Sequence, residues 1–276
     1  MAQPVDIVVF GAGGPTGREV VRAALSQGLS VRAAVRDPAK HQPALSVIRE
    51  ALPATAVKGS LEVVAADVTQ PETLPAALSG ASGAVFAASG SSYFEAAKVD
   101  CAGVAAVAAA SVAAGVKRMV LVSSQLVSPH NFWHPMRLIL SLVKWNLMDE
   151  KWRGEQVRPA GAPDPRICSP SSLRSGSRPP VQALRSTPGL SYTIVRPGRL
   201  SDGPAGATAW RVGQGDLAQR AGAIPRADVA AVCVAALLDP KAHRVTMEIA
   251  GASPPEPAVE GQLQRIFDGL VADAFK

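Results

Sequence analysis

Three glycines near the amino terminus have the spacing of a phosphate-binding turn. Gly11, Gly14 and Gly17 lie in the run GAGGPTG, directly after the apolar run VDIVVF. The first glycine allows a sharp turn, the second lets a pyrophosphate approach the backbone, and the third permits close packing of a helix. That helix would present its positive end to the phosphates. The pattern predicts a dinucleotide site, and the alternative is a glycine-rich turn without a ligand. The predicted contacts are Gly11, Gly13, Gly14, Pro15, Thr16, Gly17 and Arg18.

The residue at the end of the second predicted strand indicates which nicotinamide cofactor is preferred. NAD sites usually carry Asp or Glu there, for the ribose 2′-hydroxyl. This chain has Arg36 followed by Asp37, so a guanidinium stands where it could pair with a 2′-phosphate, with Arg18 assisting. We therefore expect NADP(H). NAD is the alternative because Asp37 lies one place later, and Arg36 could also be a solvated surface cation.

Short apolar strands alternate with helical patterns along the chain, which is typical of a parallel, doubly wound α/β sheet. The expected strands cover 5–10, 29–35, 61–66, 84–88, 118–123, 191–195 and 244–249. The expected helices cover 16–27, 96–115, 226–238 and 257–274, with a polar helix through 149–155. We expect one Rossmann-type domain, 1–276, with a small C-terminal substrate lobe.

One stretch, 158–189, does not fit this alternation. It is dense in Pro, Ser, Gly and Arg, and such a composition buries too little apolar surface to offset its ordering entropy. We interpret it as a disordered or non-family insertion, because removing about 158–180 would join a helix to the strand at 191–195. A regulatory loop, a nucleic-acid arm and an unspliced segment are the open alternatives.

The charge distribution argues against nucleic acid as a partner. The formal net charge is +6, but five arginines and one aspartate in 158–189 supply +4 of it, so the rest of the chain is near +2. No aromatic residues are interleaved with these arginines to stack on bases. A basic patch for nucleic acid is therefore not expected.

Neither the cysteines nor the histidines have the spacing of a metal site. Cys101, Cys168 and Cys233 lie far apart and are expected to be reduced, buried thiols. His130 and His134 lie four residues apart, but Pro129 breaks any helix there. No apolar stretch is long enough to span a bilayer, and no targeting segment precedes the first strand. We expect a soluble protein without a metal or an integral membrane segment.

The bulkiest apolar stretch, 132–148, has several interpretations. It could pack against the sheet, form a lid over the nicotinamide, bind a protein partner or lie at a membrane interface.

Six blocks of sequence, in family order and over most of the chain outside the insertion, resemble the atypical short-chain dehydrogenase/reductase family. They are VVFGAGGPTGREVVRAAL, VRAAVRDPAK, AADVTQPETLPAAL, GVKRMVLVSS, LSYTIVRPGRL and IPRADVAAVCVAALLDP. More narrowly, they are similar to its NAD(P)H-binding group, which includes flavin/biliverdin reductase-like enzymes and several plastid proteins. The resemblance implies a nicotinamide cofactor and a small-molecule substrate. It also implies a chloroplast stromal location, with the cytoplasm as the alternative.

The resemblance further implies cofactor contacts at the ends of the predicted strands. They are Asp67 and Val68 at the adenine, Ala87, Ala88 and Ser89 beside the ribose, Ser123 and Ser124 facing the nicotinamide, Lys151 at its ribose, and Pro197 and Gly198 on its other side. Ser123 and Lys151 are also the candidate catalytic residues. Arg226, Asp228 and Val229 match a family helix start that we expect to be structural.

The chain departs from the family at the residue that usually transfers a proton. Better-known members use Tyr-x-x-x-Lys, with the tyrosine as general acid. If Lys151 is that lysine, the tyrosine position holds Leu147, which cannot transfer a proton. Two functions stay open. The protein is either an NADP(H)-dependent oxidoreductase of a flavin-, quinone- or tetrapyrrole-like acceptor, or a non-catalytic NADP(H)-binding assembly or redox-sensing factor.

Overall fold

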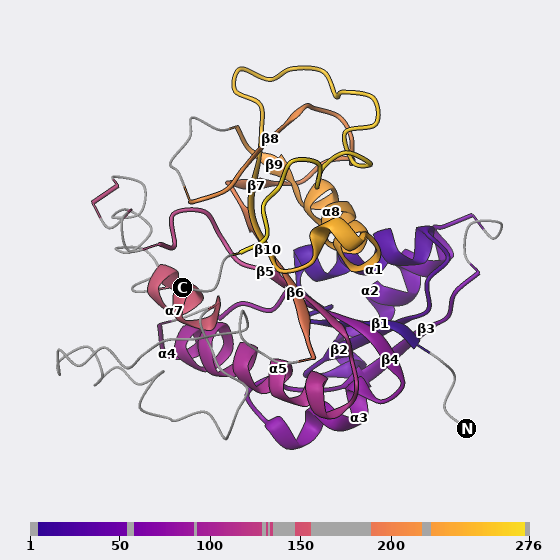
Figure 1. Ribbon diagram of the computed structural model, residues 1–276. Helices are drawn as coiled ribbons and strands as arrows, with labels where there is room; N and C mark the ends of the chain where they lie inside the picture. Colours follow the sequence, from indigo (N-terminus) through magenta and orange to yellow (C-terminus); the bar gives the residue numbers. More distant parts are fainter. Residues whose placement is uncertain are drawn as a thin grey trace, which may run out of the picture.

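The computed structural model describes residues 5–53, 58–90, 93–128, 131, 133–134, 147–155, 189–216 and 222–273. Figure 1 shows a central sheet with helices on both faces. Strands and helices alternate along residues 5–122. The described residues after 197 form mainly short strands and loops, with one long helix at 226–238.

Across the described residues, seven parallel strands and one antiparallel strand form the main sheet. They are β1 (Val5–Phe10), β2 (Val31–Val35), β3 (Leu61–Ala65), β4 (Ala81–Phe86), β5 (Arg118–Val122), β6 (Ser191–Pro197), β8 (Trp210–Gly213) and β10 (Val245–Gly251). Their order is β3-β2-β1-β4-β5-β6-β10-β8, and β8 runs antiparallel to β10. The order reverses between β1 and β4, and the crevice at their carboxyl ends is where such sheets bind ligands. The predicted Rossmann-type fold is confirmed.

Two hydrophobic cores cover the two faces of the sheet. On one face α1 (Pro15–Ser26), α2 (Pro38–Glu50) and α8 (Arg226–Leu238) pack over Ile7 and Val9 of β1. On the other face α3 (Leu74–Leu78) and α5 (Val104–Ala113) pack over Val8 and Phe10. Both sets of β1 side chains are therefore buried, as in parallel sheets covered on both faces.

Three short helices pack against one another beside the second face. They are α4 (Tyr93–Ala96), the π-helix η2 (Ala97–Gly103) and α7 (Leu147–Glu155). The 3-10 turn η1 (Pro71–Thr73) leads into α3. The π-helix leads directly into α5, and α7 packs against it. π-helical turns inside helices frequently occur at functional sites. The remaining short elements are β7 (Leu200–Ser201), β9 (Ile224–Pro225) and the 3-10 turn η6 (Pro240–Ala242).

The predicted elements agree with the structure in most of the chain. All seven predicted strands are found, and the helix at 226–238 has the predicted bounds. The helix α2 was not predicted; it begins at Pro38 behind the N-cap Asp37. The helix predicted over 96–115 is divided between α4, η2 and α5.

The predicted C-terminal helix over 257–274 is wrong. The described part of this segment consists mainly of turns, and within it Ile266 and Phe267 are buried. Gly261 and Gly269 both have positive φ, of 69° and 76°. Because this left-handed conformation interrupts a right-handed helix, the apolar spacing does not form a continuous helical face.

The cysteines differ in part from the prediction. Cys233 on α8 is a buried free thiol, and its burial raises the pKa of the thiol to about 12. Cys101 in η2 is disulfide-bonded. The expectation of three reduced thiols is therefore wrong, because separation along the sequence does not determine separation in the fold.

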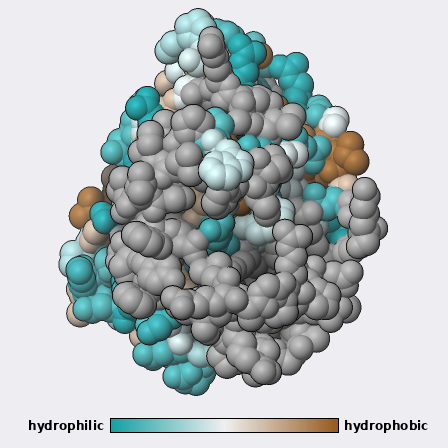
Figure 2. All heavy atoms as spheres, turned by 90° about the vertical axis from the view of Figure 1, so that its left-hand side faces the viewer, coloured by the Kyte–Doolittle hydropathy of each residue, from teal (hydrophilic) through white to brown (hydrophobic). Residues whose placement is uncertain are grey.

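Two segments singled out in the sequence lie largely outside the described residues. The insertion at 158–189 does so except for Gly189, and the bulky stretch 132–148 does so except for residues 133–134 and 147–148. Trp133 is exposed. On the face shown in Figure 2, the described side chains are mostly hydrophilic, with hydrophobic ones at its margins. None of the helices that the structure describes is long and apolar enough to cross a membrane.

Candidate functional site

The glycine turn lies at the carboxyl end of β1 and contacts the end of β4. Gly11 has a φ of 78°, and a Cβ atom there would lie 2.6 Å from the backbone nitrogen of Ala88. A Cβ at Gly17 would overlap the carbonyl group of Gly11. The first and third glycines of the motif are therefore required by the tight turn and by the close approach of α1 to the strand.

The middle glycine leaves the outer side of the turn open. Gly14 is the N-cap of α1, and a Cβ there would meet only the Gly11 carbonyl oxygen, at 3.3 Å. No side chain caps this helix, and its first turn holds no acidic residue. The first backbone N–H groups of a helix have no intrahelical partner, so this positive end suits a phosphate. These residues fit the diphosphate of a dinucleotide.

Two side chains contact the glycine turn at Gly13. Arg18 Nε donates a hydrogen bond to the Gly13 carbonyl oxygen at 3.1 Å. His41 of α2 lies against the same residue, since a Cβ on Gly13 would lie 2.6 Å from the imidazole ring. Arg18 therefore has a structural role in the turn in addition to any contact with a ligand.

The end of β2 holds the two residues that bear on cofactor choice. Arg36 is exposed, with 72% of its side chain accessible, and its Nη1 lies 4.0 Å from Glu95 Oε1 of α4. The Asp37 carboxylate accepts a hydrogen bond from the Lys40 backbone nitrogen at 3.1 Å, which caps α2. Asp37 therefore caps α2 through one of its two carboxylate oxygens.

Asp67 and Val68, the residues that the resemblance implies at the adenine, make contacts within the protein. Asp67 Oδ1 accepts hydrogen bonds from the backbone nitrogen and the hydroxyl of Thr69, at 2.9 and 2.8 Å. Val68 is buried against Gly103 of η2, where an added Cβ would lie 2.9 Å from Val68 Cγ2. Beside the turn, Ala87 and Ala88 are half-buried and Ser89 is exposed.

Lys151 is held at the inner side of α7 by a buried carboxylate. Its Nζ lies 2.7 Å from Asp100 Oδ1, and the two side chains are 11% and 2% exposed. The other oxygen of Asp100 accepts a hydrogen bond from the Gly90 backbone nitrogen at 2.8 Å. The π-helix η2 carries Asp100, so it links the loop after β4 to α7.

A buried charge network lies at the ends of β5, β6 and β10. Ser123 Oγ lies 2.6 Å from Glu155 Oε1, and Arg196 reaches both oxygens of Glu155 through Nε at 3.0 Å and Nη2 at 2.5 Å. Arg196 Nη1 lies 3.2 Å from Glu248 Oε1. Arg196 also stacks on Trp152 of α7, with 5.5 Å between Cζ and the ring centroid.

Burial and ion pairing act in opposite directions in this network. Burial disfavours the charge on Arg196, but the combined attraction of Glu155, Asp216 and Glu248 outweighs it and raises the pKa of Arg196 above its ordinary value. Burial raises the pKa of Glu248, and Arg196 offsets only part of that effect. The guanidinium is therefore charged and donates to both glutamates.

The Pro197–Gly198 turn lies beside this network. The Gln125 backbone nitrogen donates to the Pro197 carbonyl at 3.1 Å, and a Cβ on Gly198 would lie 3.2 Å from Gln125 Oε1. Ser123, Lys151 and this turn therefore lie on neighbouring elements, as the resemblance implies.

Sequence reasoning missed Asp100, Glu155, Arg196 and Glu248 as members of the site. One signal was available, because Lys151 and Glu155 lie four residues apart and hence on one face of a helix.

Leu147, at the tyrosine position, begins α7. Tyr192 has a structural role, since its hydroxyl lies 2.9 Å from Asp273 Oδ2. Asp228 does too, because Oδ1 accepts a hydrogen bond from the Gly206 nitrogen at 2.6 Å.

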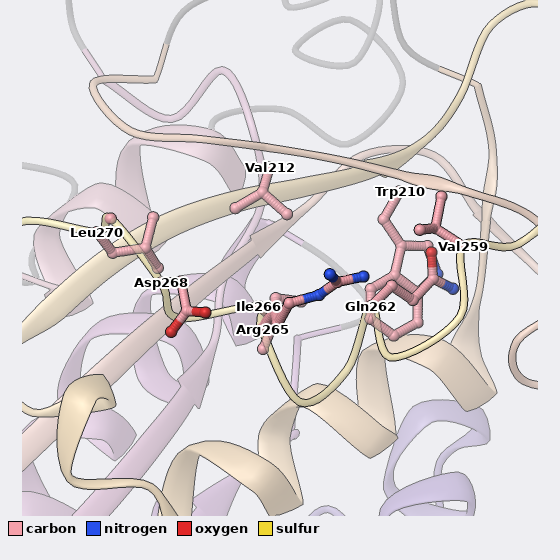
Figure 3. Close-up of a pocket in the computed structure, with 9 residues that line it drawn as sticks. Trp210, Val212, Val259, Gln262, Arg265, Ile266, Asp268 and Leu270 are labelled. Atoms are coloured by element: carbon pink, nitrogen blue, oxygen red, sulfur yellow. The ribbon is translucent and has the colours of Figure 1, made fainter.

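A separate hollow of about 450 Å³ lies between β8 and the C-terminal turns (Figure 3). It is lined by Trp210, Val212, Val259, Gln262, Arg265, Ile266, Asp268, Gly269 and Leu270. None of these residues belongs to the glycine turn or to the network around Ser123, so this hollow is distinct from the candidate cofactor site. Within the described part of the chain, no group of three His, Cys, Asp or Glu side chains could hold a metal ion.

Comparison with known proteins identifies related sequences. A family model described as NAD(P)H-binding matches residues 11–157 and 181–240, leaving 158–180 between the two ranges. An uncharacterized chloroplastic protein of Arabidopsis thaliana is 30% identical over 253 residues, which is 88% of this chain and 75% of that protein. The chloroplastic protein High Chlorophyll Fluorescence Phenotype 244, of the same plant, is 34% identical over 128 residues, 46% of this chain and 30% of its own length.

Solved structures share the fold at low sequence identity. The oxidoreductase ylbE from Lactococcus lactis has a TM-score of 0.67 at 17% identity, and the match covers 98% of this chain and 100% of that one. ChuY, an anaerobilin reductase from Escherichia coli O157:H7, has a TM-score of 0.61 at 22% identity, with 89% and 97% covered. At these identities the likeness shows the fold alone.

Proposed function

We propose that this chain, which belongs to the NAD(P)H-binding family, is an NADP(H)-dependent reductase of a flavin-, quinone- or tetrapyrrole-like acceptor. The observation that carries the proposal is the open glycine turn at the uncapped start of α1. Lys151, Ser123 and the Pro197–Gly198 turn line the strand ends along which the nicotinamide half would extend. One structural neighbour, ChuY, is described as an anaerobilin reductase, and the proposal assigns this chain the same broad class of reaction.

Arg36 is the residue that favours NADP(H) over NAD in this proposal. Its guanidinium is exposed at the end of β2, while the neighbouring Asp37 carboxylate caps α2. An exposed arginine can form two parallel hydrogen bonds to a phosphate. Asp37 lies one place past the usual position of the ribose ligand, and one of its oxygens is already engaged by the helix.

The choice of acceptor follows from the residue at the tyrosine position. Leu147 offers no proton, so the acceptor should be one whose reduction draws its proton from solvent, such as a flavin or a quinone. The cofactor would supply the hydride. In this proposal Lys151 and Ser123 hold and orient the nicotinamide half, and Asp100 keeps the Lys151 ammonium in place.

A non-catalytic role is the second candidate. The leucine at position 147 favours it, because a protein that only senses or stores NADP(H) needs no general acid. In that case the protein would be an assembly or redox-sensing factor. The relatives described as chloroplastic support a chloroplast location for either function, and within the chloroplast we propose the stroma.

Cofactor titration followed by an acceptor assay tests the proposal. NADPH and NADH are titrated into the purified protein, and the loss of reduced nicotinamide absorbance is then followed with flavin, quinone and tetrapyrrole acceptors. Binding with turnover is expected. Binding without turnover on any of these acceptors would leave the non-catalytic role, and a protein that binds neither cofactor would contradict both.

A pair of variants at Gly14 links this binding to the glycine turn. Asp and Asn are both favourable N-caps, so Gly14→Asp and Gly14→Asn should keep α1 intact. The aspartate adds a negative charge where the diphosphate would lie. We expect Gly14→Asp to lose NADPH binding and Gly14→Asn to retain much more of it, at similar melting temperatures. Equal binding by the two variants would argue that the phosphates bind elsewhere.

A further inference from the structure

The hydroxyl group of Ser123 is engaged by a carboxylate that is itself fixed from behind. Ser123 follows the end of β5, and its Oγ lies 2.6 Å from Oε1 of Glu155, the last residue of α7. Both residues are buried; Glu155 is 0% exposed. Arg196 and Glu248 pair in register on β6 and β10, so Ser123, Arg196 and Glu248 form one row across three strands.

The contacts of Glu155 determine which partner donates in the Ser123 bond. A guanidinium carries only donors and is always charged. Arg196 donates to both Glu155 oxygens, and charge-assisted bonds of this kind hold the acid as a carboxylate. A carboxylate only accepts, so the Ser123 hydroxyl hydrogen must point at Glu155 Oε1. A serine has one hydrogen and two lone pairs, and Ser123 therefore offers only lone pairs to any other group.

The position of Ser123 in the sheet indicates what those lone pairs face. Phe10 pairs with Phe86 and Phe86 with Leu121, so Ser123 lies two strands from the glycine turn. At roughly 4.8 Å between strands this is a separation of about 10 Å along the carboxyl edge. A dinucleotide whose diphosphate lies on the turn extends its nicotinamide half in this direction. The nicotinamide ring carries one group that donates N–H, the carboxamide.

We propose that Ser123 accepts a hydrogen bond from the nicotinamide carboxamide, and that Glu155 is the positioning residue that makes Ser123 an acceptor. This rests on the proposed function, because it assumes that the site binds a nicotinamide cofactor. It also assigns Ser123 a binding role in place of proton donation to the acceptor, since its hydrogen is already engaged. Arg196 acts through Glu155 and does not touch the cofactor.

Binding of two cofactors that differ only at the carboxamide tests this assignment. The probes are NADPH and its reduced 3-acetylpyridine analogue, in which a methyl group replaces the amide NH₂. The wild-type protein should bind the analogue about tenfold more weakly, because a buried acceptor would be left unsatisfied. Ser123→Ala should bind both probes within about twofold of each other. The matched control Ser111→Ala, at a buried serine of α5 outside the site, should keep the wild-type ratio.

A second variant tests the positioning role of Glu155. Glu155→Gln can donate an amide hydrogen to Ser123 Oγ, which frees the serine hydrogen to point into the site, so the tenfold preference should shrink. Loss of one partner of a buried ion pair is strongly destabilising. Melting temperature and circular dichroism therefore accompany each titration, and Ser123→Ala carries the test if Glu155→Gln does not fold.

The outcomes separate this inference from the proposed function. A Ser123→Ala protein that still prefers NADPH tenfold would overturn the acceptor role, and so would a wild-type protein that does not distinguish the probes. A wild-type protein that binds neither probe would instead contradict the proposed function.

Discussion

Replacement of Arg36 by alanine should weaken NADPH binding and leave NADH binding unchanged. The side chain is 72% exposed at the end of β2. A hydrogen bond between charged groups contributes about 1.5–3 kcal/mol, and exposure to solvent moves the value toward the lower end. Since about 1.4 kcal/mol corresponds to a factor of ten, the Kd for NADPH should rise about 10- to 30-fold.

Glu95 provides an opposite change at the same place. Its Oε1 lies 4.0 Å from Arg36 Nη1, so the carboxylate would repel a 2′-phosphate bound to that guanidinium. Exposed pairs of this kind contribute about 0.2–1 kcal/mol. Glu95→Gln should therefore tighten NADPH binding by about two- to threefold and leave NADH unchanged.

Isothermal titration of each variant with both cofactors is the measurement. Arg211→Ala is the matched control, because Arg211 is another exposed, ion-paired arginine and lies on β8 at the far edge of the sheet. It removes the same charge without approaching the site. A similar loss for NADPH and NADH in Arg36→Ala would refute the 2′-phosphate role, as would an equal loss in Arg211→Ala.

Three further predictions concern the fold and its tolerance to change. Gly17→Ala places a Cβ against the Gly11 carbonyl. We expect the free energy of unfolding to fall by about 2 kcal/mol, the melting temperature to fall by about 4 °C, and NADPH to bind more weakly. An unchanged melting temperature together with unchanged NADPH binding would contradict the packing argument. Burial raises the pKa of Asp228 above its ordinary 3.8, so its stabilising contribution is present below that value and is lost as pH rises through the folded-state pKa. Urea unfolding should therefore show Asp228→Asn gaining stability relative to wild type between pH 4 and pH 8, whereas a constant difference would argue against a raised pKa. Deletion of 158–180, the stretch between the two family-matched ranges, also removes Cys168, so the deleted and wild-type proteins are compared with their thiols reduced. Under these conditions the melting temperature and the Kd for NADPH should stay close to those of the wild type. A deleted protein that fails to fold would contradict the insertion hypothesis, and transcript sequencing across the stretch would show whether every codon is read.

Short-range patterns were sufficient for most of the fold. Val5–Phe10 and its glycine turn are recognisable in sequence because strand, turn and helix follow one another within a few residues. The helix α8 has the predicted bounds for the same reason. The predicted C-terminal helix was wrong because two glycines with positive φ decide the backbone there, and spacing of apolar residues does not reveal this.

In the candidate site, too, some features follow from the sequence and others only from contacts between distant elements. The sequence by itself determined the phosphate-binding turn, the arginine at the end of β2 and the absence of a tyrosine four residues before Lys151. Only the tertiary structure decided that Asp100 holds Lys151, and that Glu155 and Arg196 fix the hydroxyl of Ser123. The residues of these pairs belong to different elements and lie 32 to 51 positions apart in the sequence. Packing of α7 on the sheet and on η2 brings them together, and a pattern read along one chain cannot express that contact.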